Sequence, residues 1–494
     1  MFDLLIVGGG INGAAIARDA AGRGLSVLLV EAGDLACATS SAATKLIHGG
    51  LRYLENYEFR LVREALAERE TMLATAPHLV RELKFVLPHE AALRPAWMIR
   101  LGLFLYDHLA PRGRLESSHG VSLRDDLLGA PLRSNFIRGF TYADCWVDDA
   151  RLVVANALSA KELGAQIRVG TKLVAAKRFE DRWVAVLETQ GGREEAEARG
   201  VVIAAGPYVS QVLHDALRVT AHKHLRLVKG SHLVTRKLYE GEHAYILQNV
   251  DRRVVFVIPY EGRFTLIGST DAPHDAPPGP VAIGEAETEY LLAAVNRCFA
   301  RKVVREDIVW SYAGLRPLFD DGALNASVVT RDYAFDLDRD GAPALSIFGG
   351  KITTARRLAE HALETLGPAF PGLAPAWTRR TPLAGGEGLE GEFAPLLERL
   401  TREKPFLPPP LALRLARAYG ARVFPLLDAA TTLADLGEDF GCGFTRAELD
   451  HLMREEWART AEDVLWRRGK LGLHMTPAQR AGVAAAMGEA AIGK

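Results

Sequence analysis

The first thirty or so residues contain two continuous apolar runs, separated by a segment in which apolar residues recur at helical spacing. An apolar run from Leu4 to Val7 ends in three glycines, apolar residues then recur at helical spacing from Ile11 to Ala17, and a second apolar run ends at Glu31. An apolar run of this length predicts a buried strand, and the spacing between the runs predicts a helix. A strand, a helix and a strand in about thirty residues indicate the βαβ unit of a dinucleotide-binding fold.

The rest of the pattern predicts two kinds of structure. Apolar residues on one face predict a helix from Glu58 to Ala76 that stops before Pro77. Alternation predicts an antiparallel meander over residues 171–205, with a turn in residues 191–200, and a hairpin over residues 252–271 that turns at Glu261 and Gly262. From about Gly372 onward the chain reads as short amphipathic helices, so we expect a separate helical domain there.

Composition narrows the possible functions. The chain has 494 residues, a formal net charge of −1 and 48% hydrophobic residues, as in a globular protein of two or three domains. A general nucleic-acid binder needs a surplus of Lys and Arg that is missing here. Cys37, Cys145, Cys298 and Cys442 form no CxxC pair, which predicts free thiols in a reducing cytoplasm and neither a disulfide framework nor a zinc site.

Two segments bear on membranes. The N-terminus has no basic region before its apolar run, so we expect no secretory signal. Residues 94–114 are the most lipid-like segment, but the segment is short and Arg100 interrupts it, so it is not expected to cross a bilayer. A helix lying in the membrane interface and a core helix of the substrate domain both fit this pattern.

Gly8, Gly10 and Gly13 form the G-x-G-x-x-G pattern between the first strand and its helix, with Glu31 after the second strand. Glycines there let the backbone approach a pyrophosphate at a helix N-terminus, and the carboxylate can bind ribose hydroxyls. This context predicts dinucleotide binding. The glycines do not distinguish NAD from FAD.

Further glycine turns favour FAD. A Ser/Thr-rich and Gly-rich loop spans residues 37–50, a glycine turn at Gly206 follows a buried strand, and Gly349 and Gly350 precede a helix whose first turn holds Thr353 and Thr354. Such turns can follow an extended flavin, and a helix N-terminus can face its carbonyl end. With no second G-x-G-x-x-G for NAD, FAD is the expected cofactor.

Many stretches of the chain resemble the FAD-dependent glycerol-3-phosphate dehydrogenase family, specifically its bacterial aerobic, membrane-associated members. The resemblance covers nearly the whole chain and is carried by "IVGGGINGAAIARDAAGRGLSVLLVEAGDLACATSSAATKLIHGGLRYLE", "YADCWVDDARLV", "LVKGSHLV", "AYILQN", "FVIPY", "IGSTD", "IVWSYAGLRPL", "FGGKITTARRLAEHALE", "DLGEDFG" and "WRRGKLGL". It implies oxidation of sn-glycerol 3-phosphate to dihydroxyacetone phosphate, with electrons passing from FAD to a membrane quinone. It also implies a peripheral position on the cytoplasmic membrane and a homodimer.

Hydride transfer from a phosphorylated alcohol needs a base and fixed cations beside the flavin. Arg52, Arg316 and Lys351 follow glycines and are candidate phosphate ligands. Further candidates are Arg331 as a ligand and Tyr53 as a pocket wall. His232 and His48 compete for the base, and the resemblance favours His232. Arg316 is also expected to act in catalysis.

The expected cofactor site draws on glycine turns, the loop of residues 37–50 and the two later turns. It comprises Gly8, Gly10, Asn12, Gly13, Glu31, Ser40, Ser41, Lys45, Leu46, His48, Gly49, Gly206, Thr270, Asp271, Gly349, Gly350, Lys351 and Thr353. The alternatives to the quinone-linked enzyme are an FAD oxidase of a small hydroxy acid or amine and a non-catalytic flavin-binding sensor.

The expected fold class is α/β, with a Rossmann-like FAD-binding domain of the amino-acid oxidase or glutathione reductase type. We expect that domain in residues 1–75, 140–220 and 320–370. A mixed-sheet substrate domain is expected in residues 76–139 and 221–319, and the helical domain in residues 375–494.

Overall fold

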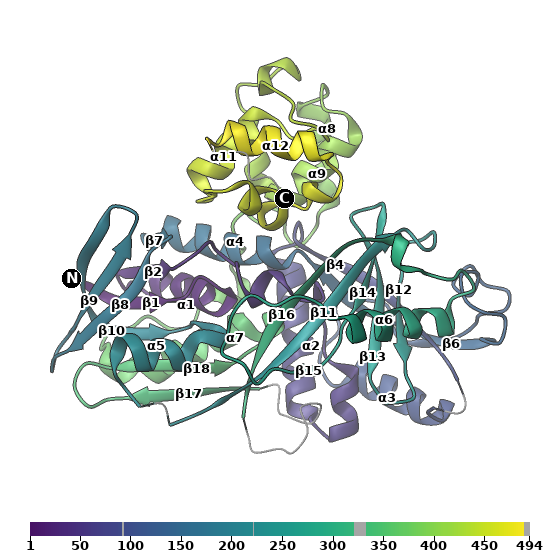
Figure 1. Ribbon diagram of the computed structural model, residues 1–494, viewed down its shortest axis with the longest axis horizontal. Coiled ribbons are helices and arrows are strands. Elements are labelled where there is room, and N and C mark those ends of the chain that lie inside the picture. The colour runs from purple at the N-terminus through teal and green to yellow at the C-terminus, as the bar shows by residue number, and fades with distance from the viewer. Residues whose placement is uncertain (91–92, 221, 321–331, 489–494) are drawn as a thin grey trace.

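Two β-sheets stand side by side and a group of helices caps their junction (Figure 1). The computed structural model describes residues 1–90, 93–220, 222–320 and 332–488. The first sheet has the strand order β17 (Tyr333–Asp338), β18 (Ala344–Gly349), β10 (Gly192–Ile203), β1 (Phe2–Val7), β2 (Val27–Glu31), β7 (Gln166–Val169), and β9 (Trp183–Thr189) pairs with both β10 and β8 (Lys172–Arg178).

β1 is the central strand of the parallel part of this sheet. It pairs in parallel with β10 on one side and β2 on the other, and β10 pairs in parallel with β18. Helices α1 (Ile11–Gly22), α4 (Asp149–Glu162) and α7 (Ala355–Leu366) pack into one apolar core with strands of this sheet. Burial on both faces explains why Leu4 to Val7 form an unbroken apolar run.

The second sheet is mostly antiparallel. Its strand order is β15 (Ala272–Pro273), β11 (Leu225–Arg236), β14 (Phe264–Gly268), β13 (Val254–Tyr260), β12 (Ala244–Gln248), β4 (Val80–Pro88), β6 (Arg138–Val147), β3 (Leu46–Ile47), with β16 (Ile308–Phe319) on β11 and β5 (His119–Ser122) on β6. Around this sheet lie α2 (Phe59–Thr75), α3 (Ala96–His108) and α6 (Glu285–Cys298), while α5 (Val209–Val212) packs by the first sheet.

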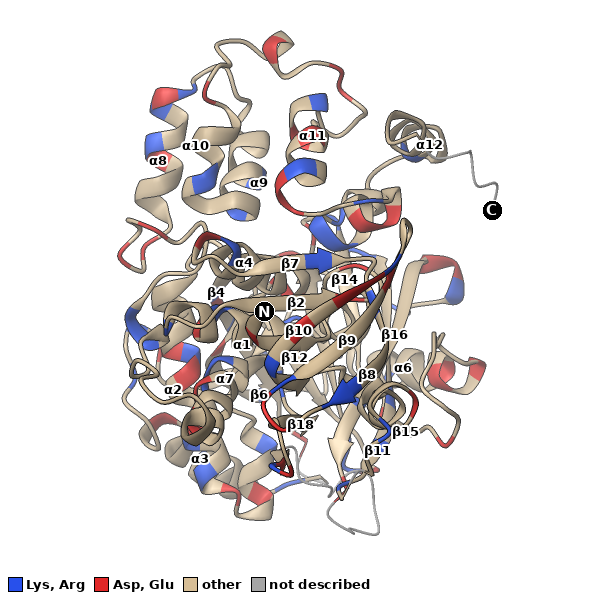
Figure 2. Ribbon diagram, turned by 90° about the vertical axis from the view of Figure 1, so that its left-hand side faces the viewer, with Lys and Arg blue, Asp and Glu red and all other residues tan. Residues whose placement is uncertain are grey.

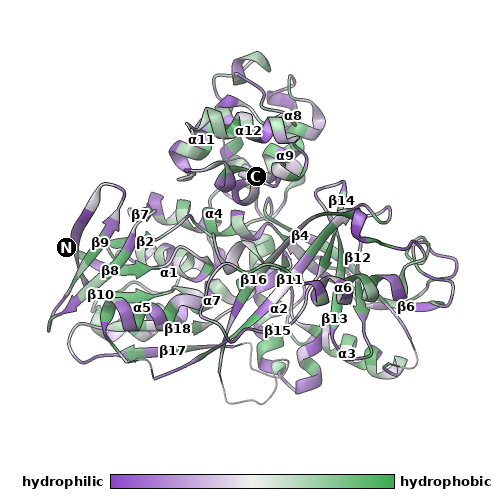
Figure 3. Cartoon of the chain, viewed as in Figure 1, coloured by the Kyte–Doolittle hydropathy of each residue, from purple (hydrophilic) through white to green (hydrophobic). Residues whose placement is uncertain are grey.

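The C-terminal helices form a unit with its own apolar core (Figure 3). They are α8 (Ala394–Glu403), α9 (Pro409–Tyr419), α10 (Val423–Leu426), α11 (Arg446–Glu455), the π-helix Asp463–Arg468 and α12 (Pro477–Ala486). Basic and acidic residues are interspersed along these helices (Figure 2). The helical texture expected after Gly372 is therefore confirmed. Within the described ranges, no helix is both long and apolar enough to cross a bilayer.

The predicted βαβ unit, the helix before Pro77 and the hairpin at Glu261 and Gly262 are all present. The turn expected in residues 191–200 lies at Gln190 and Gly191, at the very start of that segment, and the rest of the segment is strand because β10 begins at Gly192. The charged residues at the start of β10 can lie in a strand because this end of the β9–β10 hairpin is exposed to solvent. Arg193 pairs with Glu188 across the hairpin.

The expected domain boundaries stay a prediction. Strands β3 and β6 lie in the second sheet, although the sequence places residues 46–47 and 140–147 in the FAD-binding domain. The chain therefore crosses between the sheets near these two strands. Those crossings deliver the residues of the candidate site.

Candidate active site and cofactor cleft

A cavity of about 1120 Å³ lies between the two sheets. Its walls come from the ends of β1, β2 and β18, from the loop of residues 36–53 and from β16. Binding pockets for single small molecules usually measure about 300–1,000 Å³. The cavity therefore has room for a dinucleotide and a small substrate together.

The glycine turn after β1 is sterically constrained. A Cβ at Gly13 would lie 1.9 Å from the carbonyl oxygen of Gly8, and Gly8 itself has a φ of +115°. The turn must pass this close to α1 for the helix N-terminus to face the cavity. Glu31, at the end of β2, accepts hydrogen bonds from the backbone N–H of Gly9 (2.6 Å) and of Gly33 (2.8 Å). Glycine turn, helix N-terminus and carboxylate together fit the pyrophosphate and ribose of FAD.

The loop of residues 36–53 is pinned by a buried ion pair. Lys45 Nζ donates to Asp149 Oδ2 (2.7 Å) at the start of α4 and to the carbonyl of Ser41 (2.7 Å). Burial lowers the pKa of Lys45, and the Asp149 carboxylate opposes that shift. Asp149 also accepts from the backbone N–H of Ala43. Lys45 thus holds the loop from behind and is not among the residues that line the cavity.

A second buried network fixes the glycine pair of this loop. The N–H of Gly49 donates to the hydroxyl oxygen of Tyr106 (2.8 Å), and that hydroxyl donates to Asp144 (2.7 Å). Arg69 donates to the same carboxylate (2.9 Å). Burial raises the pKa of Asp144, and the nearby Arg69 guanidinium opposes this. His48 lies beside these groups, its ring 6.5 Å from that of Phe256.

The antiparallel pairing of β11 with β16 brings the "KGSH" and "GLRP" stretches together. His232 stands opposite Tyr312, and Gly230 stands opposite Gly314. Arg316 crosses over Gly230, where a Cβ would lie 2.3 Å from the guanidinium. The guanidinium pairs with Asp271 and donates to the Ser269 hydroxyl (2.6 Å) and the Thr270 carbonyl (3.1 Å).

His232 is fully buried behind Thr44. Its Nε2 lies 3.0 Å from the Thr44 hydroxyl, its ring stacks on Tyr312 at 4.7 Å, and a Cβ at Gly268 would collide with it at 2.1 Å. The other nitrogen, Nδ1, has no hydrogen-bond partner among the described residues. Burial, then the charges of Arg316 and Lys45, hold the pKa of His232 well below its usual 6.5. The imidazole is therefore neutral at pH 7.

Two more cations reach the cavity near the glycine pair. Lys351, just after β18, places Nζ 4.3 Å from the centre of the Tyr53 ring. Arg52, in the adjacent 3-10 turn Leu51–Asn56, makes no ion pair or hydrogen bond with any described residue. Arg331 lies outside the described residues.

Most of the expected site residues line the cavity, and six do not. The lining includes Gly8, Gly10, Asn12, Glu31, Ser40, Leu46, His48, Arg52, Tyr53, Gly206, Asp271, Arg316, Gly349, Gly350, Lys351 and Thr353. Gly13, Ser41, Lys45, Gly49, His232 and Thr270 are absent from it. The Thr270 hydroxyl donates to Glu287 of α6 (2.7 Å) and accepts from the backbone N–H of Ser231 in β11. Thr270 therefore links α6 to β11.

Sequence reasoning missed several lining residues, one in the loop before β3 and four on the second sheet. Thr44, Phe85, Tyr142, Asp144 and Phe256 all face the cavity. One signal was available for two of them. Tyr142 and Asp144 are two residues apart in "FTYADCWV", so they share a face of β6, and an aspartate within an apolar strand indicates a buried polar role.

Comparison with known proteins supports a flavin site. Residues 3–356 match the family described as FAD dependent oxidoreductase, and residues 376–491 match the C-terminal domain of alpha-glycerophosphate oxidase. A solved structure of a glycerol-3-phosphate dehydrogenase from Bacillus halodurans complexed with FAD has a TM-score of 0.77 and 27% identity, covering 95% of this chain and 86% of that one.

Two curated relatives match nearly end to end. A glycerol-3-phosphate dehydrogenase of Pseudomonas aeruginosa is 54% identical, over 97% of this chain and 94% of the relative. A D-erythritol 1-phosphate dehydrogenase of Brucella abortus is 49% identical, over 97% and 96%. The two relatives are named for different polyol phosphates.

Gly13→Ala should abolish retention of FAD. The new Cβ would collide with the Gly8 carbonyl, so either the turn or α1 must move away from the pyrophosphate position. The measurement is the flavin absorbance per mole of purified protein. Gly102→Ala on α3 is the control, since a Cβ there meets nothing within 4 Å and flavin content should match the wild type. Full flavin in Gly13→Ala would contradict the placement of the dinucleotide.

Proposed function

The chain belongs to the FAD-dependent oxidoreductases, within their glycerol-3-phosphate dehydrogenase branch, and we propose that it oxidises sn-glycerol 3-phosphate to dihydroxyacetone phosphate. When bound, FAD supplies a hydride acceptor at N5. The residues of the glycine turns, Glu31 and the loop of residues 36–53 would hold it. The observation that carries the proposal is the charge of the cavity wall between that loop and β16.

The wall is matched to a phosphate monoester. Three cations, Arg52, Arg316 and Lys351, lie on this wall, and the Asp271 carboxylate pairs with Arg316. A phosphate monoester carries about −1.5 to −2 at pH 7. A carboxylate carries a single charge and needs only one bidentate Arg, so an oxidase of a hydroxy acid or amine would leave this wall with excess positive charge.

We propose that His232 is the base that accepts the proton of the substrate hydroxyl. A neutral imidazole can accept the hydroxyl proton. The Thr44 hydroxyl separates Nε2 from the cavity, so a proton reaching Nε2 would pass through it. His48 lines the cavity directly and remains the competing candidate.

The test of the proposed reaction is anaerobic reduction of the bound flavin. Adding sn-glycerol 3-phosphate should bleach the flavin absorbance, whereas glycerol and lactate, which lack the phosphate, should not. The Brucella abortus relative makes D-erythritol 1-phosphate the second substrate to test. Bleaching by that ester alone would redirect the proposal to a four-carbon substrate, and bleaching by lactate alone would refute it.

Arg316→Ala should raise the KM for the phosphate ester by about 10- to 100-fold, the loss expected for a hydrogen bond between charged groups. Flavin content should stay close to that of the wild type. Arg236→Ala, at the exposed end of the same strand pair, is the matched control and should leave KM unchanged. Loss of flavin with an unchanged KM would show that Arg316 serves the cofactor.

The pH profile tests His232. Since its pKa is lowered, the group binds a proton only well below pH 6.5, and kcat/KM should fall by less than about twofold from pH 7.5 to 6.5 on its account. The substrate phosphate titrates in this range as well, so the profile is compared with that of His232→Gln, in which only the phosphate contribution remains. An acid limb at or above pH 6.5 that disappears in His232→Gln would contradict a buried neutral base. If His48→Gln removes the limb, the base is His48.

For the electron acceptor we propose a quinone at the cytoplasmic membrane, reached beside α3. One face of this helix packs Ile99, Leu103 and Tyr106 into the second sheet, while Trp97, Met98, Leu101 and Phe104 are exposed. Arg94, Arg112 and Arg114 flank it, and the exposed Arg100 lies within it. An exposed apolar face with flanking arginines suits a helix lying in a membrane interface.

The inner face of α3 contacts the site. Tyr106 bonds both Gly49 and Asp144, and Asp144 lines the cavity. A helix is about 10–12 Å across with its side chains, so lipid on one side of α3 would lie close to the cavity on the other. This geometry supports α3 as the route to the quinone. The expected homodimer stays a prediction.

Replacing Trp97 and Leu101 together by Glu should weaken binding to vesicles of phosphatidylglycerol and phosphatidylethanolamine by on the order of tenfold or more, because two apolar side chains no longer insert. Co-sedimentation measures the bound fraction. Leu127→Glu with Val250→Glu is the control pair, since these residues are 86% and 81% exposed and lie away from α3 in the sequence. Equal loss in both pairs would contradict the assignment of α3.

A further inference from the structure

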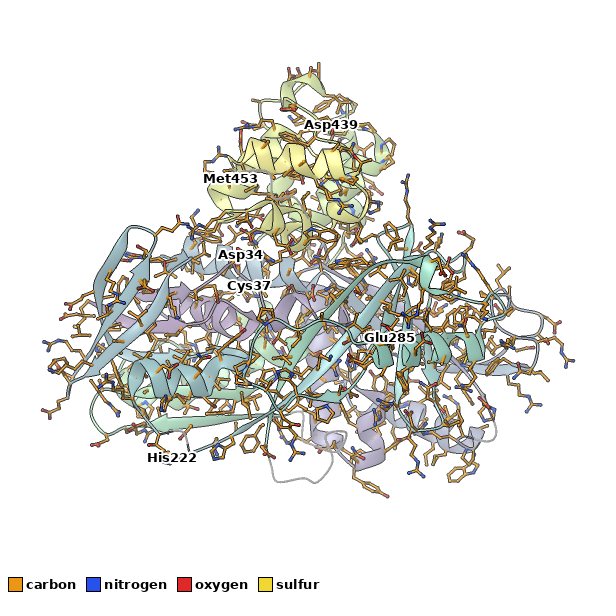
Figure 4. The ribbon with its side chains drawn as sticks, viewed as in Figure 1. Asp34, Cys37, His222, Glu285, Asp439 and Met453 are labelled. Atoms are coloured by element: carbon orange, nitrogen blue, oxygen red, sulfur yellow. The ribbon has the colours of Figure 1, made fainter. Side chains whose placement is uncertain are left out.

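The loop that follows β2 begins directly after Glu31 and contacts three neighbours. The backbone N–H of Ala36 donates to the carbonyl of Gly9 (3.0 Å), and the carbonyl of Gly33 accepts from the backbone N–H of Gly170 (2.8 Å). The loop is thus built into the cofactor turn on one side and the edge of the sheet on the other. Figure 4 shows Asp34 and Cys37 at the underside of the C-terminal helices, where these meet the rest of the molecule.

Asp34 forms ion pairs with two arginines of the C-terminal helical unit. Arg468 donates from both terminal nitrogens to the two Asp34 oxygens (2.6 and 2.7 Å), and Arg467 donates to Oδ2 (2.8 Å). The Arg468 side chain is fully buried and that of Asp34 is 6% exposed. A bidentate pair of this kind fixes orientation as well as distance. These arginines lie more than 430 residues from Asp34 along the chain.

The arginines are themselves held from several sides. They end the π-helix Asp463–Arg468, an irregular element often found at functional sites. Trp466 stacks on Trp310 of β16 at 4.7 Å, and Arg468 donates to the backbone carbonyl of Glu456 (3.1 Å). Asp463 pairs with Arg467. The segment is therefore a fixed support and not a flexible arm.

We propose that Arg467 and Arg468 of the C-terminal helical unit are positioning residues for the cofactor, acting through Asp34 to hold Glu31 in place for the adenosine ribose of FAD. The inference rests on the proposed seating of FAD against Glu31. It assigns the helical unit a role in cofactor retention. Asp34 stands three residues from Glu31, and the Glu31 carboxylate accepts from the N–H of the intervening Gly33 (2.8 Å). A shift of Asp34 would therefore move Gly33 and, through it, the Glu31 carboxylate.

The helical unit contains a second bidentate pair, with a buried carboxylate and a partly exposed arginine, that does not involve this loop. Arg414 donates from two nitrogens to Glu448 (2.6 and 2.7 Å) within the helical unit. Removing Arg414 should destabilise the helical unit, since the buried Glu448 carboxylate loses its bidentate cation, as Asp34 does when Arg468 is removed. The two positions differ in whether that carboxylate belongs to the cofactor loop.

The experiment measures release of FAD from purified full-length holoenzyme, followed by the rise of free flavin fluorescence after dilution. Arg467→Gln and Arg468→Met should accelerate release by on the order of tenfold, about the effect of losing one or two hydrogen bonds at the ribose. Arg468→Lys should fall between Arg468→Met and wild type, because it keeps the charge without the fork. Affinity of the apoprotein for ADP should fall in parallel.

The spectrum of the flavin that stays bound should be unchanged in these variants, since the altered contacts lie at the adenosine end. Arg414→Met should release FAD at the wild-type rate when all proteins are compared well below their unfolding temperatures. Wild-type release from both Arg467→Gln and Arg468→Met would overturn the inference, and so would equal acceleration by Arg414→Met. A wild-type protein without any flavin would refute the proposed function instead.

Discussion

The site depends on how one loop is held between two sheets. Residues 36–53 face the cofactor turns at one end and the wall with Arg52, Arg316 and Lys351 at the other, so only a short part of this segment can pair within a sheet. Lys45 ties the loop to α4 through Asp149, and Tyr106 with Asp144 ties it to the second sheet at Gly49. Unpaired charges are costly to bury, so each group keeps its partner and the loop keeps one path.

The pairing of β11 with β16 complements that loop. It carries Arg316 across Gly230 toward Asp271 and places His232 beside Tyr312, whose hydroxyl donates to the carbonyl of Ala43 in the loop (2.9 Å). Small residues on these strands leave the room that the larger groups occupy. Cations and a neutral imidazole thus come to one wall, and the Thr44 hydroxyl stands between that imidazole and the cavity.

The helical unit completes the arrangement from outside. Its π-helix faces both halves of the molecule, with Arg468 on the loop after β2 and Trp466 on β16. The neighbouring pair of Arg151 on α4 with Glu456 adds a further buried contact across the same interface. Because the carboxylates and cations there are mutually paired, docking of the unit and the shape of the cofactor loop are coupled.

Local rules determined much of this protein from its sequence. The βαβ unit, the glycine turn with Glu31, the helix before Pro77 and the helical C-terminus follow from period and turn chemistry within a few residues. Tertiary structure alone decided that Lys45 lies behind the cavity, that His232 lies behind Thr44 and that Asp34 forms an ion pair with Arg468. It also decided that α3 is both a core and a surface helix. Sequence period shows which face of an element is apolar, but a charge's partner is set by packing between segments hundreds of residues apart.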